Sequence, residues 1–385
     1  MTRPEEDVLA TAQTRGEAAR ASHDVVLEVE NLTVGFPTDD GLVQAVRGVS
    51  YQLRRGEVLG IVGESGSGKS VTSMAVMGLL PGTARVAGSV RFDGRELIGA
   101  SDAELTRIRG RRIAMIFQDP MTSLNPVYTI GYQIAEAVRA HHDVSKEAAL
   151  ARAAELLEIV RIPNAKARLS NYPHELSGGM RQRVVIAIAM ANDPDVIIAD
   201  EPTTALDVTV QAQILDALDT AREETGAAMV LITHDLGVIA GRADRVLVMY
   251  AGKPVESGSA DDVFYTPRMP YSLGLLGSLP RLDRPAERLT PIPGAPPSLV
   301  NMPPGCPFTP RCPLAREVCD EQEPELAATT SPEHTAACHF SDELVGVEPE
   351  QLFRTRVTDT EALAEFVRET ADLESSDLES RDNAS

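Results

Sequence analysis

One stretch of the sequence decides the fold: Gly63-Glu64-Ser65-Gly66-Ser67-Gly68-Lys69-Ser70. It fits the pattern G-x-x-x-x-G-K-[ST], in which a glycine-rich loop binds the phosphates of a nucleotide. An apolar run at 58–62 precedes it and is typical of a buried strand, and residues 71–80 suit a buried helix. The loop therefore lies at a helix N-terminus, whose unpaired N–H groups attract anions.

The pattern also assigns chemistry to single residues. The glycines let the backbone approach the phosphates closely. Lys69 is expected to reach the β- and γ-phosphates, and the Ser70 hydroxyl is expected to ligate Mg²⁺. The motif predicts a nucleotide site and leaves the use of the nucleotide open.

Length and charge narrow the class of protein. A chain of 385 residues is long enough for one large domain with an appendage, or for two domains. No run of about 18 apolar residues without a charge occurs, so no membrane-spanning helix is expected. Residues 1–24 lack the apolar core of a signal peptide, which predicts a flexible N-terminus and a cytosolic chain. The net charge of −21 argues against a nucleic-acid partner.

Apolar strands alternate with helices along most of the chain. After two N-terminal strands, buried strands are predicted at 113–117, 195–199, 228–233 and 245–250. Continuous apolar strands between helices favour a mainly parallel sheet that is covered on both faces. A helical block interrupts the alternation and is interpreted as an inserted subdomain at about 119–176.

Polar residues stand where several of these strands end. Asp200 is placed to hold the water shell of Mg²⁺ beside Ser70, and Glu201 can orient or deprotonate an attacking water. Gln118 and His234 each end an apolar strand. A second anion-binding surface is predicted at a helix N-terminus. Its residues are Ser177, Gly178 and Gly179.

The order of these motifs resembles the nucleotide-binding domain of ABC transporters, over about residues 25–265. The motifs are the phosphate loop, Gln118, Leu-Ser-Gly-Gly at 176–179, Asp200-Glu201, Ala205-Leu206-Asp207 and His234. Residues 118–126 and 176–183, with the cysteine-bearing C-terminus, are more narrowly similar to the ATPase subunits of oligopeptide, dipeptide and nickel importers. Met180 replaces the glutamine of most ABC proteins, as is common in that branch.

The resemblance implies a fold and a set of roles. The fold would be a P-loop NTPase with a RecA-like core, an inserted helical subdomain, an N-terminal antiparallel β subdomain and a small irregular C-terminal appendage. Phe36 would stack on the adenine of ATP, and Gln118 would contact Mg²⁺ and sense the membrane partner. His234 would hold the γ-phosphate and the water. Ser177 and Gly179 would bind ATP on an opposite subunit, to which Asp207 would bridge.

The resemblance also implies partners and a place in the cell. It predicts an ATPase that drives peptide uptake at the cytoplasmic face of the membrane. The expected partners are two integral membrane permease subunits, a second ATP-binding subunit (identical or a paralogue) and, indirectly, an extracellular solute-binding protein. Nickel or another small solute stays open as cargo. A soluble ABC ATPase of DNA repair or translation and a regulatory module without turnover are the other readings; the intact Glu201 and His234 argue against the latter.

The C-terminal part differs in composition. Residues 266–340 are rich in proline and contain all four cysteines, Cys306, Cys312, Cys319 and Cys338, spaced C-x5-C-x6-C-x18-C. Buried unligated cysteines, disulfides and structural zinc with a nearby histidine are alternatives, although the C-x2-C knuckle of zinc sites is missing. Wide spacing suits a larger group, and members of the resembled branch carry a [4Fe–4S] cluster, so such a cluster is predicted. Residues 341–385, with thirteen acids against four arginines, predict a disordered tail.

Overall fold

Two β-sheets form the frame of the molecule. The computed structural model describes residues 24–39, 41–204, 207–279 and 290–353. The smaller, antiparallel sheet has the strand order β2-β1-β4-β5. Its strands are β1 (Val25–Thr38), β2 (Gly41–Arg54), β4 (Arg85–Phe92) and β5 (Arg95–Glu96).

The larger sheet has the order β11-β12-β10-β9-β3-β8-β7-β6. The five strands at its β6 end run parallel because helices connect them. They are β6 (Ile113–Ile116), β7 (Val196–Asp200), β8 (Ala228–Thr233), β3 (Val58–Val62) and β9 (Arg245–Tyr250). β3, β7 and β8 are buried along their whole length, which explains their unbroken apolar sequences.

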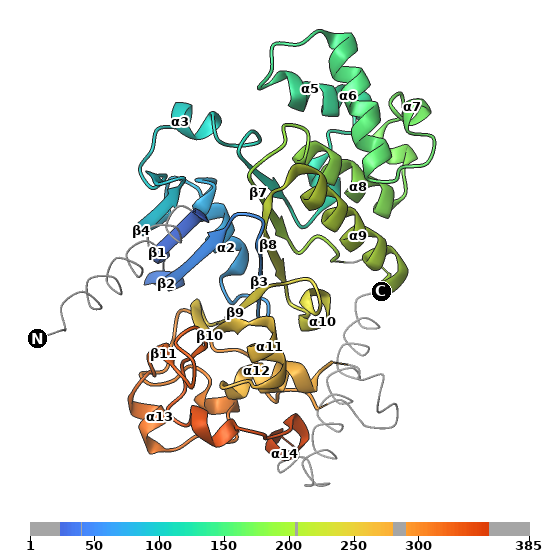
Figure 1. Ribbon diagram of the computed structural model, residues 1–385. Helices are drawn as coiled ribbons and strands as arrows, with labels where there is room; N and C mark the ends of the chain where they lie inside the picture. Colours follow the sequence, from blue (N-terminus) through green and yellow to red (C-terminus); the bar gives the residue numbers. More distant parts are fainter. Residues whose placement is uncertain (1–23, 40, 205–206, 280–289, 354–385) are drawn as a thin grey trace, which may run out of the picture.

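Alternate residues of these strands supply two separate cores. Ile198 and Val230 face the core shared with the small sheet and with α2 (Lys69–Val76). Ile197 and Met229 face the opposite core, shared with α8 (Gly178–Ala189) and α9 (Val208–Thr225). Figure 1 shows the parallel strands between the small sheet on one side and α8 and α9 on the other. The predicted α/β fold with an N-terminal antiparallel sheet is confirmed.

A helical region lies between β6 and α8. It consists of α4 (Pro120–Ser123), α5 (Ile130–Arg139), α6 (Lys146–Ile159), α7 (Ala165–Arg168) and the short 3-10 turn η1 (Pro173–Glu175). Side-chain caps start the two longer helices: Thr129 accepts from Tyr132 N at 3.3 Å, and Ser145 accepts from Ala148 N at 3.1 Å. The remaining short helices before the last parallel strand are α3 (Asp102–Thr106) and α10 (Leu236–Ile239).

The C-terminal region, residues 290–353, extends the larger sheet and is not a separate appendage. Its β12 (Thr335–Ala336) pairs with β10 (Lys253–Ser259) and with β11 (Ala327–Ala328). Its apolar side chains, including Phe308 and Leu344, belong to the core that contains α8 and α9. The other elements in this part of the chain are α11 (Ala260–Tyr265), α12 (Pro270–Gly277), η2 (Thr309–Arg311), α13 (Glu317–Glu321), η3 (Ser341–Leu344) and α14 (Pro349–Phe353).

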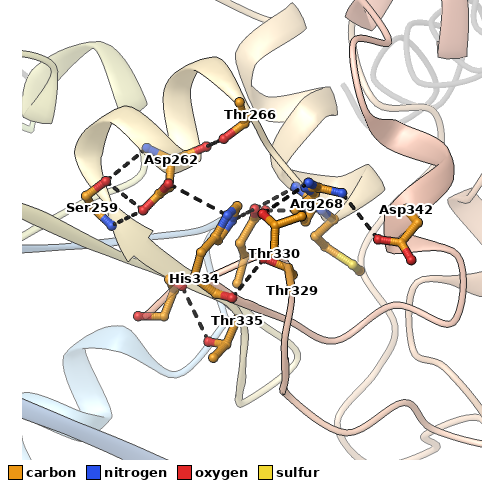
Figure 2. A network of polar contacts seen from close by, with 12 residues as sticks. Ser259, Asp262, Thr266, Arg268, Thr329, Thr330, His334, Thr335 and Asp342 are labelled. Atoms are coloured by element: carbon orange, nitrogen blue, oxygen red, sulfur yellow. Dashed lines mark hydrogen bonds and ion pairs between the residues drawn. The ribbon is translucent and has the colours of Figure 1, made fainter. Parts of the chain in front are cut away.

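A buried polar network joins the C-terminal region to β10 (Figure 2). His334 Nε2 lies 2.8 Å from Glu256 Oε1, and both residues are almost fully buried. The same carboxylate accepts the backbone N–H groups of Arg268 and Met269 at 2.6 and 3.2 Å. Buried polar groups are tolerated when their partners are present, so this network fixes one arrangement of the segments that it joins.

The C-terminus is ordered further than the sequence suggests. Residues 341–353 form η3 and α14, and Leu352 and Phe353 are buried in the shared core. The expected disorder therefore does not begin at residue 341. The rest of the predicted tail, residues 354–385, and the predicted flexible N-terminus up to residue 23 lie outside the described residues.

The prediction of a [4Fe–4S] cluster at the four cysteines is wrong. Within the described ranges, no group of three or more His, Cys, Asp or Glu side chains is arranged to hold a metal ion. All four cysteines are free. Burial raises the pKa of Cys312 to about 12 and that of Cys338 to about 11, so these thiols stay protonated and pack as small apolar groups. The sheet extension and the shared core hold this region against the rest of the molecule.

Candidate nucleotide-binding site

The phosphate loop needs glycine at its first and sixth positions. Gly63 has φ 152°, and a Cβ there would lie 2.1 Å from Met249 O. Gly68 has φ 97°, and a Cβ there would lie 2.5 Å from Ala45 O. Any larger residue would displace the backbone of β9 or β2, so the close packing of the loop against both sheets explains these glycines.

Lys69 begins α2 and lies folded against the loop. Its Nζ donates to the carbonyls of Gly63 and Glu64 at 2.7 and 2.9 Å, and it lies 3.7 Å from Glu201 Oε1. The side chain is only 4% exposed. Burial lowers the pKa of Lys69, and the neighbouring carboxylates of Glu201 and Asp200 oppose that shift. The ammonium is thus held inside the loop, where phosphate oxygens would meet it.

Ser70 and Asp200 present oxygen atoms to each other. Ser70 Oγ donates to Asp200 Oδ1 at 2.9 Å across the end of β7. Burial raises the pKa of Asp200, with the Ser70 hydrogen bond opposing and the charge of Glu201 adding to the rise. A desolvated carboxylate beside a hydroxyl is a donor set that Mg²⁺ prefers, so these residues fit the predicted metal.

The carboxylate of Glu201 contacts three side chains, two of which follow the strands next to β7. Its Oε2 accepts from Gln118 Nε2 at 3.2 Å and from Thr204 Oγ1 at 2.9 Å, and lies 3.3 Å from His234 Nδ1. Gln118 follows β6, Glu201 follows β7 and His234 follows β8, and these strands are adjacent and parallel. Their carboxyl ends therefore meet at one edge of the sheet, and the three side chains lie together there.

The backbone at Glu201 is strained. Its φ is 47°, a region that side chains other than glycine rarely adopt, and its N–H donates to Ile232 O at 2.9 Å. Such conformations persist only where the surroundings impose them, and they gather at functional sites. From this conformation, the carboxylate of Glu201 reaches both Gln118 and His234.

Lys69, Ser70, Gln118, Glu201 and His234 line one cavity of about 790 Å³, a size that suits a small-molecule ligand. The described lining residues are Ala45, Glu64, Ser65, Gly66, Ser67, Gly68, Lys69, Ser70, Val71, Gln118, Glu201, His234, Pro296 and Leu299. They do not include Phe36, which pairs with Val43 on β2 and packs against the core of the small sheet. Its predicted contact with adenine stays a prediction.

The second anion-binding motif lies elsewhere on the surface. Ser177 caps α8 by accepting from Met180 N at 3.4 Å, and Ser177 and Gly178 are exposed. Asp207 caps α9, accepting from the N–H groups of Thr209 and Val210 at 3.1 and 3.0 Å. A Cβ at Gly179 would lie 2.6 Å from Val210 Cγ1, so the two helix ends are neighbours. Ala205 and Leu206 of the predicted motif lie outside the described residues.

Sequence reasoning missed several residues of this site. Thr204 is one: its hydroxyl donates to Glu201 Oε2 at 2.9 Å from three residues further along the chain. Pro296, Leu299 and Arg311 are others, and nothing in their local sequence points to a phosphate loop more than 200 residues away. Tertiary packing alone brings them there.

Comparison with known proteins shows which protein families and solved structures this chain resembles. A family model described as "ABC transporter" matches residues 46–204, and one described as "Oligopeptide/dipeptide transporter, C-terminal region" matches residues 255–319. Among solved structures, the dimeric bacterial ABC transporter cassette MJ0796 is 30% identical with a TM-score of 0.54, covering 61% of this chain and 98% of that one. Its post-hydrolysis form with ADP and Pi gives a TM-score of 0.55 at the same identity and coverage.

Named relatives indicate the kind of ABC transporter cassette to which this chain is similar. The chain is 51% identical to the oligopeptide transport ATP-binding protein OppD of Salmonella typhimurium, over 86% of this chain and 98% of that protein. It is 54% identical to the dipeptide transport ATP-binding protein DppD of Bacillus subtilis, over 83% and 95%. It is 57% identical to OppD of Mycobacterium tuberculosis over 86% of this chain, but spans only 54% of that relative's length. The chain belongs to the oligopeptide and dipeptide transport ATP-binding family of ABC transporter cassettes.

Proposed function

We propose that this chain is the ATP-hydrolysing subunit of an importer that takes up peptides. The observation that carries the proposal is the position of Glu201. Gln118, Thr204 and His234 hold its carboxylate at the cavity in which Lys69 and the phosphate loop lie. A fixed carboxylate near a phosphate loop can orient and deprotonate the water that attacks a γ-phosphate. The family of the chain supports the same reaction.

The roles of the site residues follow from this geometry. The backbone N–H groups of the loop and the Lys69 ammonium would bind the phosphates of ATP. Ser70 and Asp200, together with Gln118, would hold Mg²⁺, which supplies positive charge against the developing negative charge on the phosphates. His234 would bind the γ-phosphate from the other side of Glu201 and steady the water.

The exposed motif at the start of α8 supports a second ATP-binding subunit. Ser177 and Gly178 offer a hydroxyl and backbone N–H groups that do not reach the cavity of their own chain. Such a surface can bind a phosphate that another subunit presents. The cassette MJ0796, which this chain resembles, is described as dimeric. Asp207 lies next to the motif and is placed to contact that partner.

Peptide cargo and membrane partners rest on different observations. The matched C-terminal model and the names of the relatives concern oligopeptide or dipeptide transport. No helix among the described residues has the length and apolar character to cross a membrane. An exposed apolar patch for a permease subunit lies between α4 and α5, where Met121 is 60%, Val127 70%, Tyr128 45% and Tyr132 42% exposed. Contacts between this patch and a permease subunit would hold the chain at the cytoplasmic face of the membrane.

Uptake measurements test the proposal. A source strain that lacks this chain would be complemented with the wild-type sequence or with Glu201→Gln, and the entry of a labelled tripeptide and of labelled nickel would be followed. We expect the wild type alone to restore peptide entry, because only it turns over ATP, and we expect nickel entry to stay unchanged. Restoration of nickel entry without peptide entry would contradict the proposed cargo.

A further inference from the structure

Glu64 is the second residue of the phosphate loop, and its carboxylate, backbone N–H and carbonyl all form hydrogen bonds. The carboxylate of Glu64 accepts two hydrogen bonds from the guanidinium of Arg311, at 2.6 and 2.9 Å. Its backbone N–H donates to Tyr271 Oη at 2.8 Å, and its carbonyl accepts from Lys69 Nζ at 2.9 Å. The side chain of Glu64 is thus engaged by the C-terminal region.

Arg311 is itself held rigidly. Its side chain is 4% exposed, and its Nε donates to Pro293 O at 2.9 Å. Its guanidinium carbon lies 5.9 Å from the ring centre of Tyr250 and 5.8 Å from that of Phe308. A planar guanidinium that packs against two neighbouring rings and is paired through two bonds has a defined orientation, which fixes that of the carboxylate.

The same segment reaches the cavity directly. Pro296 and Leu299 line it together with Lys69 and the rest of the loop. Leu299 is partly buried against the core that also holds Phe308. Residues 293–311 therefore contact the nucleotide site in two ways, through the wall of the cavity and through the loop that binds phosphate.

We propose that residues 293–311 are part of the ATP site. Arg311 is a positioning residue that holds the phosphate loop and neutralises Glu64, and Pro296 and Leu299 close the cavity beside the nucleotide. The inference rests on the proposed function, since it concerns the same ATP. It assigns to the C-terminal region a part in nucleotide affinity.

The sign of the charge effect distinguishes this role from a merely structural one. Without Arg311, the carboxylate of Glu64 would lack its cationic partner beside a loop that must accept several phosphate charges. Like charges repel strongly in such a partly desolvated place, and an unpaired charge is costly to keep there. Removing the carboxylate as well should remove the repulsion. Loss of packing alone would make the double variant no better than the single one.

Nucleotide affinity of the full chain provides the test, with Mg²⁺ and the slowly hydrolysed analogue AMP-PNP as the probe. We expect Arg311→Gln to raise the Kd roughly tenfold, since about 1.4 kcal/mol of repulsion corresponds to that factor. The double variant with Glu64→Gln should return to within about threefold of the wild type, on the same conversion. Arg268→Gln is the matched control, because it removes another guanidinium that is 5% exposed, from the network of Figure 2. It should lower the Tm and leave the Kd unchanged.

Hydrogen exchange at the backbone amides of the wild type is a second test of the inference, and it does not depend on any variant being able to fold. Bound AMP-PNP should slow exchange at the amides of 298–302 and 311, and those of 317–321 in α13 should not change. An unchanged Kd in Arg311→Gln, a double variant as weak as the single one, or no slowing at 298–302 would each overturn the inference. A wild type that does not bind AMP-PNP would contradict the proposed function as well, whereas normal binding by all variants would contradict this inference alone.

Discussion

At the scale of single residues, Asp200 shows that the site is built for a ligand and not for the stability of the free protein. Its side chain is nearly buried, and the second acid, Glu201, follows it directly. Lys69 supplies one positive charge to the two carboxylates. Burial and the neighbouring charge raise the pKa of Asp200, so its ionised form is disfavoured in the folded chain.

This imbalance predicts that Asp200→Asn stabilises the nucleotide-free protein. A raised pKa means that the folded state holds the proton to higher pH than the unfolded state, so stability from this group is present below the ordinary value of 3.8 and is lost as pH rises through the folded pKa. At neutral pH the substitution removes the disfavoured charge and keeps an oxygen that accepts from Ser70. We expect the Tm to rise by a few degrees, since about 1 kcal/mol corresponds to ~2–4 °C in a domain of this size.

The pH dependence of this increase in Tm tests the explanation more sharply than the increase itself. The difference in Tm between Asp200→Asn and the wild type should be largest at neutral pH and should shrink in more acidic buffer, where Asp200 becomes protonated. Asp143→Asn, which neutralises an exposed carboxyl in the loop between α5 and α6, should change the Tm little at any pH. If the Tm difference instead grew on acidification, the predicted direction of the Asp200 pKa shift would be wrong.

The position of a residue in the site can be predicted from the sequence only where its sequence neighbours indicate that position. Gln118, Glu201 and His234 each follow a buried strand, and adjacent parallel strands bring their ends together, so their proximity has a local signal in the sequence. Their roles in ATP hydrolysis stay predictions. Arg311 is different, because its role depends on a contact with Glu64 across 247 positions of the chain. No periodicity or motif near Arg311 encodes that contact.

At the scale of elements, the helical region between β6 and α8 links the two motifs that we propose to act on ATP. It begins beside Gln118, which bonds to Glu201, and it ends at Ser177, which caps α8. Its apolar patch includes Tyr128 and Tyr132, whose rings stack at 4.7 Å between centres. A movement of this region on docking would therefore reach both motifs.

The position of the patch predicts the docking surface for a membrane subunit. On assembly with the permease subunits, exchange at the amides of α5 and the residues before it, 124–139, should slow, because binding covers the exposed side chains. The amides of 317–321 in α13, which belong to the C-terminal region, serve as the internal control. Slowing elsewhere, with unchanged exchange across 124–139, would rule out this surface.

Element prediction was reliable where patterns are long and failed where they are short. The unbroken apolar runs of β3, β7 and β8 and the helical spacing of α6 could be read from the sequence. The two residues of β12 are too few to show a period, and their pairing with β10 follows only from the tertiary structure. The sequence interpretation therefore missed the extension of the sheet.

At the scale of the whole molecule, the C-terminal region shares one core with the nucleotide-binding part. Phe308, Leu344 and Phe353 pack in the same cluster as the sheet and its helices, and Arg311 reaches the phosphate loop. A proline-rich composition with few apolar residues suggests a region that needs a metal cluster to order it. Since those few apolar residues insert into an existing core, the cysteines need not be ligands.

The central claim is that Glu201 positions the water that hydrolyses ATP in an importer assembled around this chain. The most direct test is the ATPase rate and the bound ATP of the assembled complex with Glu201→Gln. Because the amide keeps the shape and loses charge and basicity, we expect ATP to stay bound while turnover falls by about 10²–10⁴-fold, the usual contribution of a general base. Near-normal turnover in the Glu201→Gln complex would contradict the account.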